Sequence, residues 1–268
     1  MTWTRGLALA ALVALGACAS EPVGDRTSSS PPPMSPIPTT EASEIAPAAG
    51  TGEEIGEDLA EAAVDKRAGF HGKFDRIPAA LAGEMRGTTW TPGCPVPLDD
   101  LRLLHFNSWG VDGAVKRGPM VVNASVAQDV LWVFRQLFEA RFPLKRVALA
   151  TEFKPERFAQ HRRITSHRSV TAAFNCRPVV TPLGPGDSYS QHSFGLAIDV
   201  NPLQNPYVTA TGFVRNRIAE RYVDRSRDLE GMIHEGDVVY RSFTAIGWEW
   251  GGHWSSDKDY MHFSGSGT

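Results

Sequence analysis

The chain has 268 residues, of which 42% are hydrophobic and 21% are charged, and its formal net charge at pH 7 is −3. This length fits one globular domain with additional segments better than two full domains. The charge balance is not basic enough to indicate nucleic-acid binding, so we expect no nucleic-acid partner.

The first twenty residues have the composition of an export signal. Arg5 forms a minimal positive region, and the apolar stretch GLALAALVALGA at 6–17 is too short to span a bilayer. The stretch ends in LGAC, which resembles the lipobox of bacterial lipoproteins, where the cysteine, here Cys18, is diacylated. We therefore expect residues 1–18 to be a lipoprotein signal peptide, with Cys18 anchored in a membrane. Ordinary cleavage near Ala17–Ala19, with release of a soluble protein, is the alternative.

Residues 19–69 are predicted to be a tether between this anchor and a folded domain at 70–268. Their first part is rich in Ser, Pro, Thr, Ala and Glu and cannot bury enough apolar surface to fold. A short acidic helix is expected at 51–66. The remaining cysteines, Cys94 and Cys176, form either one disulfide in an oxidising compartment or a pair of inert buried thiols.

The folded domain begins with short elements of both kinds. We predict strands at 101–106 and 115–123, the second leading to a helix at 125–142, whose apolar residues repeat at helical spacing. Pro143 follows as a stop signal, and 145–150 is expected to be a further strand. Hydrophobic alternation at 196–200, 238–250 and 260–263 supplies the remaining elements. The absence of a regular strand–helix alternation predicts an α+β fold.

The stretch LAIDV at 196–200 reads as a buried strand that carries an acid. If it is a strand, Ile198 faces the core and Asp199 faces the other side. A carboxylate there is costly unless something binds its charge. Gly195 allows a turn that lets the side chains of His192 and Asp199 converge on one point.

A third ligand is expected from the C-terminal run GWEWGGHWSSDKDYMHF at 247–263. Its aromatic and glycine residues crowd five polar candidates, in the manner of a pocket. The candidates are Glu249, His253, Asp257, Asp259 and His262. A His–Asp–His set with an open fourth position is typical of catalytic zinc.

Two of these segments resemble a known family. SQHSFGLAID fits the S-x-H-x-x-G-x-A-x-D signature of the zinc D-alanyl-D-alanine carboxypeptidases of the VanY type, and DYMHF fits their second motif. GWEWGG resembles a branch that includes L-alanyl-D-glutamate endolysins. The resemblance covers roughly residues 100–265. It implies a small antiparallel sheet flanked by helices, the hedgehog-like or DD-peptidase-like zinc peptidase fold. One departure is Ser264, where an acid is commoner.

The resemblance also implies roles for individual residues. It makes Asp259 the catalytic acid/base and Arg177 the residue that binds substrate. The zinc ligands would be His192, Asp199 and His262. Because Asp259 and His262 are an odd number of residues apart, an extended strand cannot present both on one face, and a bend through Tyr260–Met261 is required.

Three alternatives stay open within this site. Glu249 is the rival base, and His253 is a rival ligand. The cluster of His and Arg residues at 161–168 forms either a solvated face or part of a substrate groove.

The sequence therefore predicts an exported, membrane-anchored zinc peptidase that faces the cell wall or periplasm and hydrolyses peptidoglycan stem peptides. D-Alanyl-D-alanine carboxypeptidase is the first choice. An L-alanyl-D-glutamate endopeptidase and a non-catalytic zinc-containing cell-wall binding module are the alternatives. We expect a monomer.

Overall fold

The computed structural model describes residues 69–153, 169–181, 184–214 and 216–267. The predicted signal peptide with Cys18, the acidic helix at 51–66 and the basic cluster at 161–168 lie outside the described residues, and these stay predictions. Within the described ranges, no helix is both long enough and apolar enough to cross a membrane.

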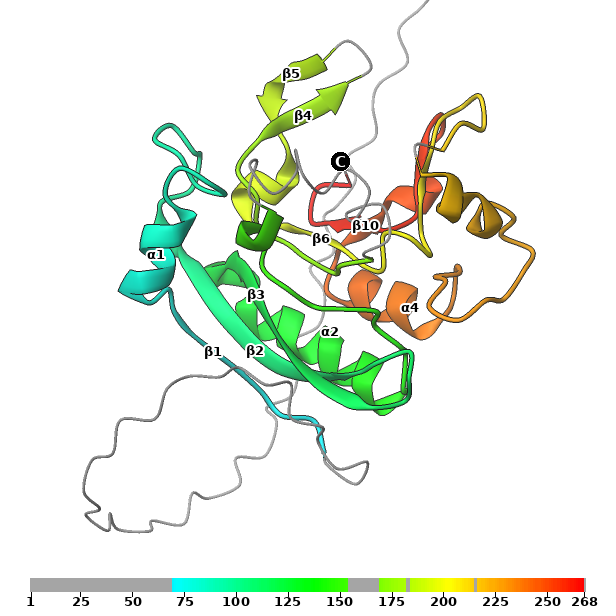
Figure 1. Ribbon diagram of the computed structural model, residues 1–268, viewed down its shortest axis with the longest axis horizontal. Coiled ribbons are helices and arrows are strands. Elements are labelled where there is room, and N and C mark those ends of the chain that lie inside the picture. The colour runs from blue at the N-terminus through cyan, green and yellow to red at the C-terminus, as the bar shows by residue number, and fades with distance from the viewer. Residues whose placement is uncertain (1–68, 154–168, 182–183, 215, 268) are drawn as a thin grey trace, which may run out of the picture. The chain divides into compact units, whose positions relative to one another are not determined.

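The N-terminal half is built on a three-stranded antiparallel sheet. Its strands are β1 (Gly72–Arg76), β2 (Leu101–Trp109) and β3 (Val115–Asn123), in the order β1-β2-β3. β2 and β3 pair along their whole length and are joined by a short turn, so each strand finds its partner close by in the sequence (Figure 1). Both predicted strands are confirmed, and β2 continues three residues beyond the predicted end.

Helix α2 (Ala127–Glu139) covers one face of this sheet. Its buried side chains include Val130, Phe134 and Leu137, as the helical spacing predicted, although the helix is shorter than 125–142. The preceding 3-10 turn (Ala124–Val126) is capped by Asn123, whose side chain accepts a hydrogen bond from the Ser125 amide. Apolar burial on one face therefore fixes the helix against the sheet.

The other elements are short. They comprise α1 (Ala79–Met85), β4 (Pro178–Thr181), β5 (Gly184–Tyr189), β6 (Ala197–Asp199), β7 (Tyr207–Val208), α4 (Val238–Ala245), β8 (Glu249–Trp250), β9 (Lys258–Asp259) and β10 (His262–Ser264). A second sheet has the order β6-β10-β8, and β4–β5 and β7–β9 are two-stranded pairs. All these strand pairs are antiparallel. The architecture is α+β, as predicted.

Two segments differ from their sequence pattern. The strand predicted at 145–150 is wrong: one bridge, between Val147 and Thr171, replaces a ladder. The backbone amide of Lys145 donates to the Asn201 side chain, and among the described residues no continuous strand pairs with this segment. The alternating run at 238–250 divides into helix α4 and strand β8, because Asp237 caps the helix by accepting from the Tyr240 amide.

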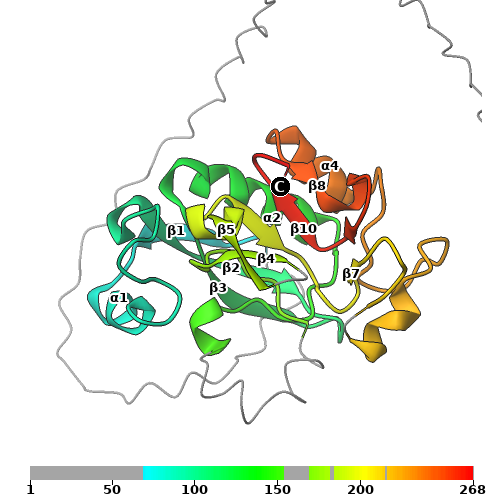
Figure 2. The same ribbon diagram turned by 90° about the horizontal axis from the view of Figure 1, so that it is seen from above.

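One apolar cluster supports both three-stranded sheets. Its members come from β2, α2, β6, α4 and β10, and they include Phe106, Phe134, Ile198, Phe243 and Phe263. Phe106 stacks on Phe134 with ring centroids 4.2 Å apart, and Phe243 stacks on Phe263 at 4.3 Å. Helices α2 and α4 pack side by side, and β10 lies next to α4 in both views (Figures 1 and 2). The second sheet, which carries the site, therefore rests on the core of the first.

Candidate metal and active site

Strand register brings together two residues that are 63 positions apart. In the β6–β10 pair, His262 lies directly opposite Asp199, and Ser264 lies opposite Ala197. The Nδ1 atom of His262 is 3.1 Å from Oδ1 of Asp199. Ile198 and Phe263, the next pair, point into the core and are fully buried. Core packing on one face of the sheet thus places a carboxylate and an imidazole together on the other.

His192 reaches the same carboxylate from a 3-10 turn, Gln191–Phe194. The turn ends at Gly195, which has φ +67°, and a Cβ atom there would lie 2.5 Å from the Asn123 amide nitrogen. Glycine is therefore required for both conformation and space. The Nε2 atom of His192 is 3.3 Å from Oδ1 of Asp199.

The carbonyl of Ala173 sets the orientation of the His192 ring. It lies 2.7 Å from Nδ1 of His192, so this nitrogen carries the hydrogen and Nε2 presents a lone pair to Asp199. A lone pair that faces a carboxylate oxygen at 3.3 Å requires a proton or a cation between the two atoms.

The three ligand atoms, one each from His192, Asp199 and His262, all lie within 4.8 Å of one another. Both imidazoles are buried, and the Asp199 side chain is 25% exposed. The Nδ1 atom of His262 faces the cluster, since it lies 3.1 Å from Asp199 Oδ1, and the buried Nε2 atom has no hydrogen-bond partner among the described residues. Two nitrogens and one carboxylate oxygen are a donor set that suits zinc and leaves a fourth position open. The residues therefore fit the expected ion.

The charge of Asp199 is stabilised by its two neighbours. Burial raises the pKa of Asp199, but the charges and hydrogen bonds of His192 and His262 outweigh burial and hold that pKa well below its usual range. This answers the electrostatic problem of an acid in the LAIDV strand.

Asp259 lies near this cluster with the opposite electrostatic character. Burial, followed by the charge of Asp199, raises the pKa of Asp259 to about 7, while His262 and Arg177 oppose that rise. Its Oδ1 atom is buried and makes no hydrogen bond within the described part of the chain. The predicted bend is confirmed, since a turn at Tyr260–Met261 separates β9 from β10. A carboxyl group with a pKa near neutrality is suited to acid/base chemistry.

One glycine of the GWEWGG run, Gly251, packs closely against Asp259. A Cβ atom at Gly251 would lie 2.6 Å from the Asp259 carbonyl oxygen and 3.0 Å from its Cβ atom. The glycine therefore lets one backbone segment approach β9 closely and supports the position of Asp259.

The rival candidates lie elsewhere. Glu249 is exposed in β8, where it pairs with Ser264. The His253 side chain is 47% exposed, and its Nε2 atom lies 3.5 Å from Oε2 of Glu235. Asp257 accepts hydrogen bonds from the Tyr207 hydroxyl and the Ala210 amide. None of these three rivals belongs to the His–Asp–His group.

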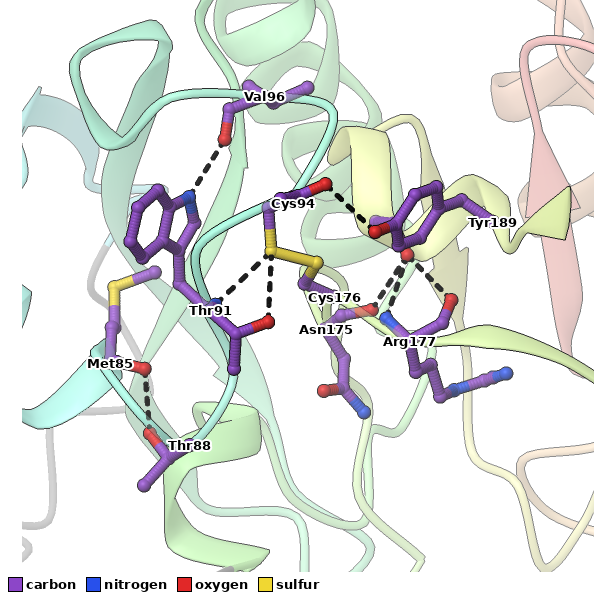
Figure 3. Close-up of a disulfide and its surroundings, with 12 residues drawn as sticks. Met85, Thr88, Thr91, Cys94, Val96, Asn175, Cys176, Arg177 and Tyr189 are labelled. Carbon is purple, nitrogen blue, oxygen red and sulfur yellow. Dashed lines mark hydrogen bonds between the residues drawn. A yellow bond between two sulfur atoms is a disulfide. The ribbon is translucent and has the colours of Figure 1, made fainter. Parts of the chain in front are cut away.

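Arg177 follows a disulfide. Cys94 and Cys176, whose pairing the sequence left open, are bonded, with Cα atoms 6.0 Å apart (Figure 3). The half-buried Arg177 donates from Nη1 to the Pro178 carbonyl at 3.2 Å. Because its charge lowers the pKa of Asp259, its guanidinium is within electrostatic range of the candidate site.

Two contributors carried no signal in the sequence. The Ala173 carbonyl is a backbone group, which residue type does not reveal. Ser193, whose bonds are described below, occupies an unspecified position of the S-x-H-x-x-G-x-A-x-D signature.

A cavity of about 860 Å³ lies apart from the three candidate ligands. Its lining includes Trp109, Arg141, Arg225, Asp228, Glu230 and His234. It contains no residue of the His–Asp–His group, and its charges of both signs select no class of ligand.

The comparison with protein families gives a match for the same part of the chain. A family model described as D-alanyl-D-alanine carboxypeptidase matches residues 184–265. The resemblance to this peptidase family is confirmed. The matched stretch contains His192, Asp199, Asp259 and His262 but begins after Arg177, and it is shorter than the 100–265 expected. The family supports a peptidase, and hence a hydrolase. No curated protein and no solved structure matches the chain.

Proposed function

We propose that the protein is a zinc-dependent peptidase of peptidoglycan stem peptides, acting as a D-alanyl-D-alanine carboxypeptidase. One observation carries this proposal: the candidate ligand atoms of His192, Asp199 and His262 lie within 4.8 Å of one another, and the buried Asp259 is close enough for the charges of Asp199 and His262 to shift its pKa. The family match over 184–265 supports it. We further propose that the α+β architecture is the zinc DD-peptidase fold.

The residues have distinct roles in this proposal. His192, Asp199 and His262 hold the zinc ion, which when bound activates water and polarises the scissile carbonyl. Asp259 takes a proton from the attacking water and returns it to the leaving amine. Its raised pKa favours both directions of this transfer. Arg177 binds the terminal carboxylate of the substrate.

The proposed location rests on the predicted lipoprotein signal peptide and on the disulfide of the folded domain. We propose that lipidated Cys18 holds the enzyme at a membrane and that the tether lets a monomeric domain reach the cell wall. The Cys94–Cys176 disulfide supports an oxidising compartment, where such bonds persist.

The cleaved bond can be read by mass spectrometry. The full chain, loaded with zinc, is incubated with muramyl pentapeptide, and His192→Ala serves as the control. Loss of one alanine is the expected result. Release of a tetrapeptide that begins with D-glutamate, leaving muramyl-L-alanine, would instead favour the endopeptidase, and an intact peptide would favour a binding module.

A further inference from the structure

The segment 173–177 runs beside the 3-10 turn that carries His192. At its start, the Ala173 carbonyl lies 2.7 Å from His192 Nδ1. Two residues later, the Asn175 amide donates to the His192 carbonyl at 3.1 Å. The segment that orients the candidate metal ligand thus leads directly to Arg177, the proposed substrate-binding residue.

Ser193 joins the backbone of Arg177 to this turn. The fully buried Ser193 hydroxyl accepts from the Arg177 amide at 2.9 Å and donates to the Arg177 carbonyl at 2.8 Å. The Ser190 amide donates to the same carbonyl at 3.1 Å. Both backbone polar groups of Arg177 are therefore held by residues on either side of His192.

The disulfide holds the segment from its other side. Cys176 is bonded to Cys94, and its amide donates to the Thr89 carbonyl at 2.8 Å. A second tie joins the same loop to β5, since the Tyr189 hydroxyl donates to the Gly93 carbonyl at 2.8 Å. Figure 3 shows the Arg177 side chain extending away from the disulfide. The backbone of Arg177 is therefore anchored next to the disulfide, whereas its guanidinium lies away from it.

We propose that the Cys94–Cys176 disulfide and Ser193 are positioning groups that fix Arg177 relative to His192 and thereby set the affinity for the carboxylate end of the substrate. This inference rests on the proposed function. An arginine on a fixed backbone loses less freedom when it binds a carboxylate, so more of the interaction energy is available for binding. The disulfide and the hydrogen bonds of the Ser193 hydroxyl involve no ligand atom of the metal site. Loss of either should therefore raise KM and leave kcat nearly unchanged.

Steady-state kinetics of the full, zinc-loaded chain test the proposal. Relative to the wild type, Cys94→Ser/Cys176→Ser and Ser193→Ala should each raise KM for a peptide ending in D-Ala-D-Ala by roughly 10-fold. Their kcat should stay within about two-fold, and their zinc content should equal that of the wild type. A fall in kcat together with zinc loss would show general damage and overturn the proposal.

A double-mutant cycle separates positioning from general stability. If the disulfide acts through Arg177, its removal in an Arg177→Ala background should raise KM no further. Additive effects on KM would overturn the proposal. Tyr189→Phe removes the neighbouring tie without touching Arg177, and its KM should stay within about two-fold of the wild type. An equal rise in that variant would assign the effect to the loop as a whole and overturn the specific role of the disulfide. If the double serine variant fails to fold, Ser193→Ala decides the question, and an unchanged KM there overturns the role of Ser193.

Hydrogen exchange at the Arg177 amide distinguishes this proposal from the proposed function. The amide should exchange faster in both the disulfide variant and Ser193→Ala, whether or not the enzyme is active. A zinc-loaded wild type that cleaves no stem peptide would overturn the proposed function together with the effect on KM. An active wild type whose variants show unchanged exchange at Arg177 would overturn the positioning role alone.

Discussion

The two three-stranded sheets of this protein are held together differently. In β1–β2–β3, the long strands β2 and β3 follow each other in the chain and pair over nine residues each. In β6–β10–β8, the strands have only two or three residues, and the β6–β10 pair joins residues 63 positions apart. At one end of the β6–β10 pairing in this second sheet, an aspartate lies opposite a histidine.

The first sheet contributes mainly to stability, whereas the second sheet carries the candidate active site. The first sheet is stabilised by local strand pairing and by the apolar face of α2. The second sheet has too few backbone hydrogen bonds to be stable alone. It depends on the shared apolar core and on the proton or cation that balances the charge of Asp199. Changes in the α2 core should lower global stability, whereas changes in the ligand set should remove metal and activity and leave the first sheet folded.

His192→Ala should have the largest effect. Removing one of three ligands should abolish zinc binding and lower activity by about 10⁴-fold or more. Because the first sheet does not depend on the metal, the β2 and β3 amides should stay protected from hydrogen exchange. Metal analysis and hydrogen exchange check both statements, and normal zinc content in this variant would refute the ligand assignment.

Phe134→Ala should act on the other region. Phe134 is 1% exposed and stacks on Phe106, so its truncation should lower the free energy of unfolding by about 3–5 kcal/mol. Zinc affinity of the folded protein should not change. Trp132→Ala is the matched control on the same helix. Because Trp132 is 40% exposed, the control should change stability by only about 0.5 kcal/mol. Equal losses in urea unfolding would contradict this account of the core.

Asp259→Asn should separate catalysis from metal binding. Zinc should stay bound while kcat falls by roughly 100-fold or more, because the amide cannot accept the proton. Glu249→Gln is the control, since Glu249 is exposed, and its kcat should stay within about two-fold. If Asp259→Asn kept full activity and Glu249→Gln lost it, the roles of the two acids would be reversed.

The pH dependence of the metal-free protein should reveal the raised pKa of Asp259. The pKa of Asp259 is raised from 3.8 to about 7 in the folded state, so the folded state holds a proton that the unfolded state has lost. The stabilising contribution of this proton is present at low pH and is lost as the pH rises towards 7, by at most about 1.4 kcal/mol per pH unit.

Asp259→Asn should lack this dependence. Urea unfolding of the metal-free wild type and variant from about pH 4 to about pH 8 should give stability curves that diverge with rising pH, with the wild type losing stability. Parallel curves would contradict a raised pKa at this position.

Sequence patterns determined the parts of this protein that depend on neighbouring residues. The periodicity of β2, β3 and α2 follows from one buried face in each element, and the spacing from His192 to Asp199 follows from a turn that needs Gly195. The same kind of reasoning was wrong at 145–150, where the local residues favour a strand but only one isolated bridge forms within the described part of the chain.

Tertiary structure alone decided the rest. The register that sets His262 opposite Asp199 spans 63 residues, and the Cys94–Cys176 disulfide spans 82. The orientation of His192 depends on the Ala173 carbonyl, a group that every residue possesses. The physical reason is common to all three. Residue types state which groups a site can use, but distances between groups far apart in the chain are set by packing of the whole core.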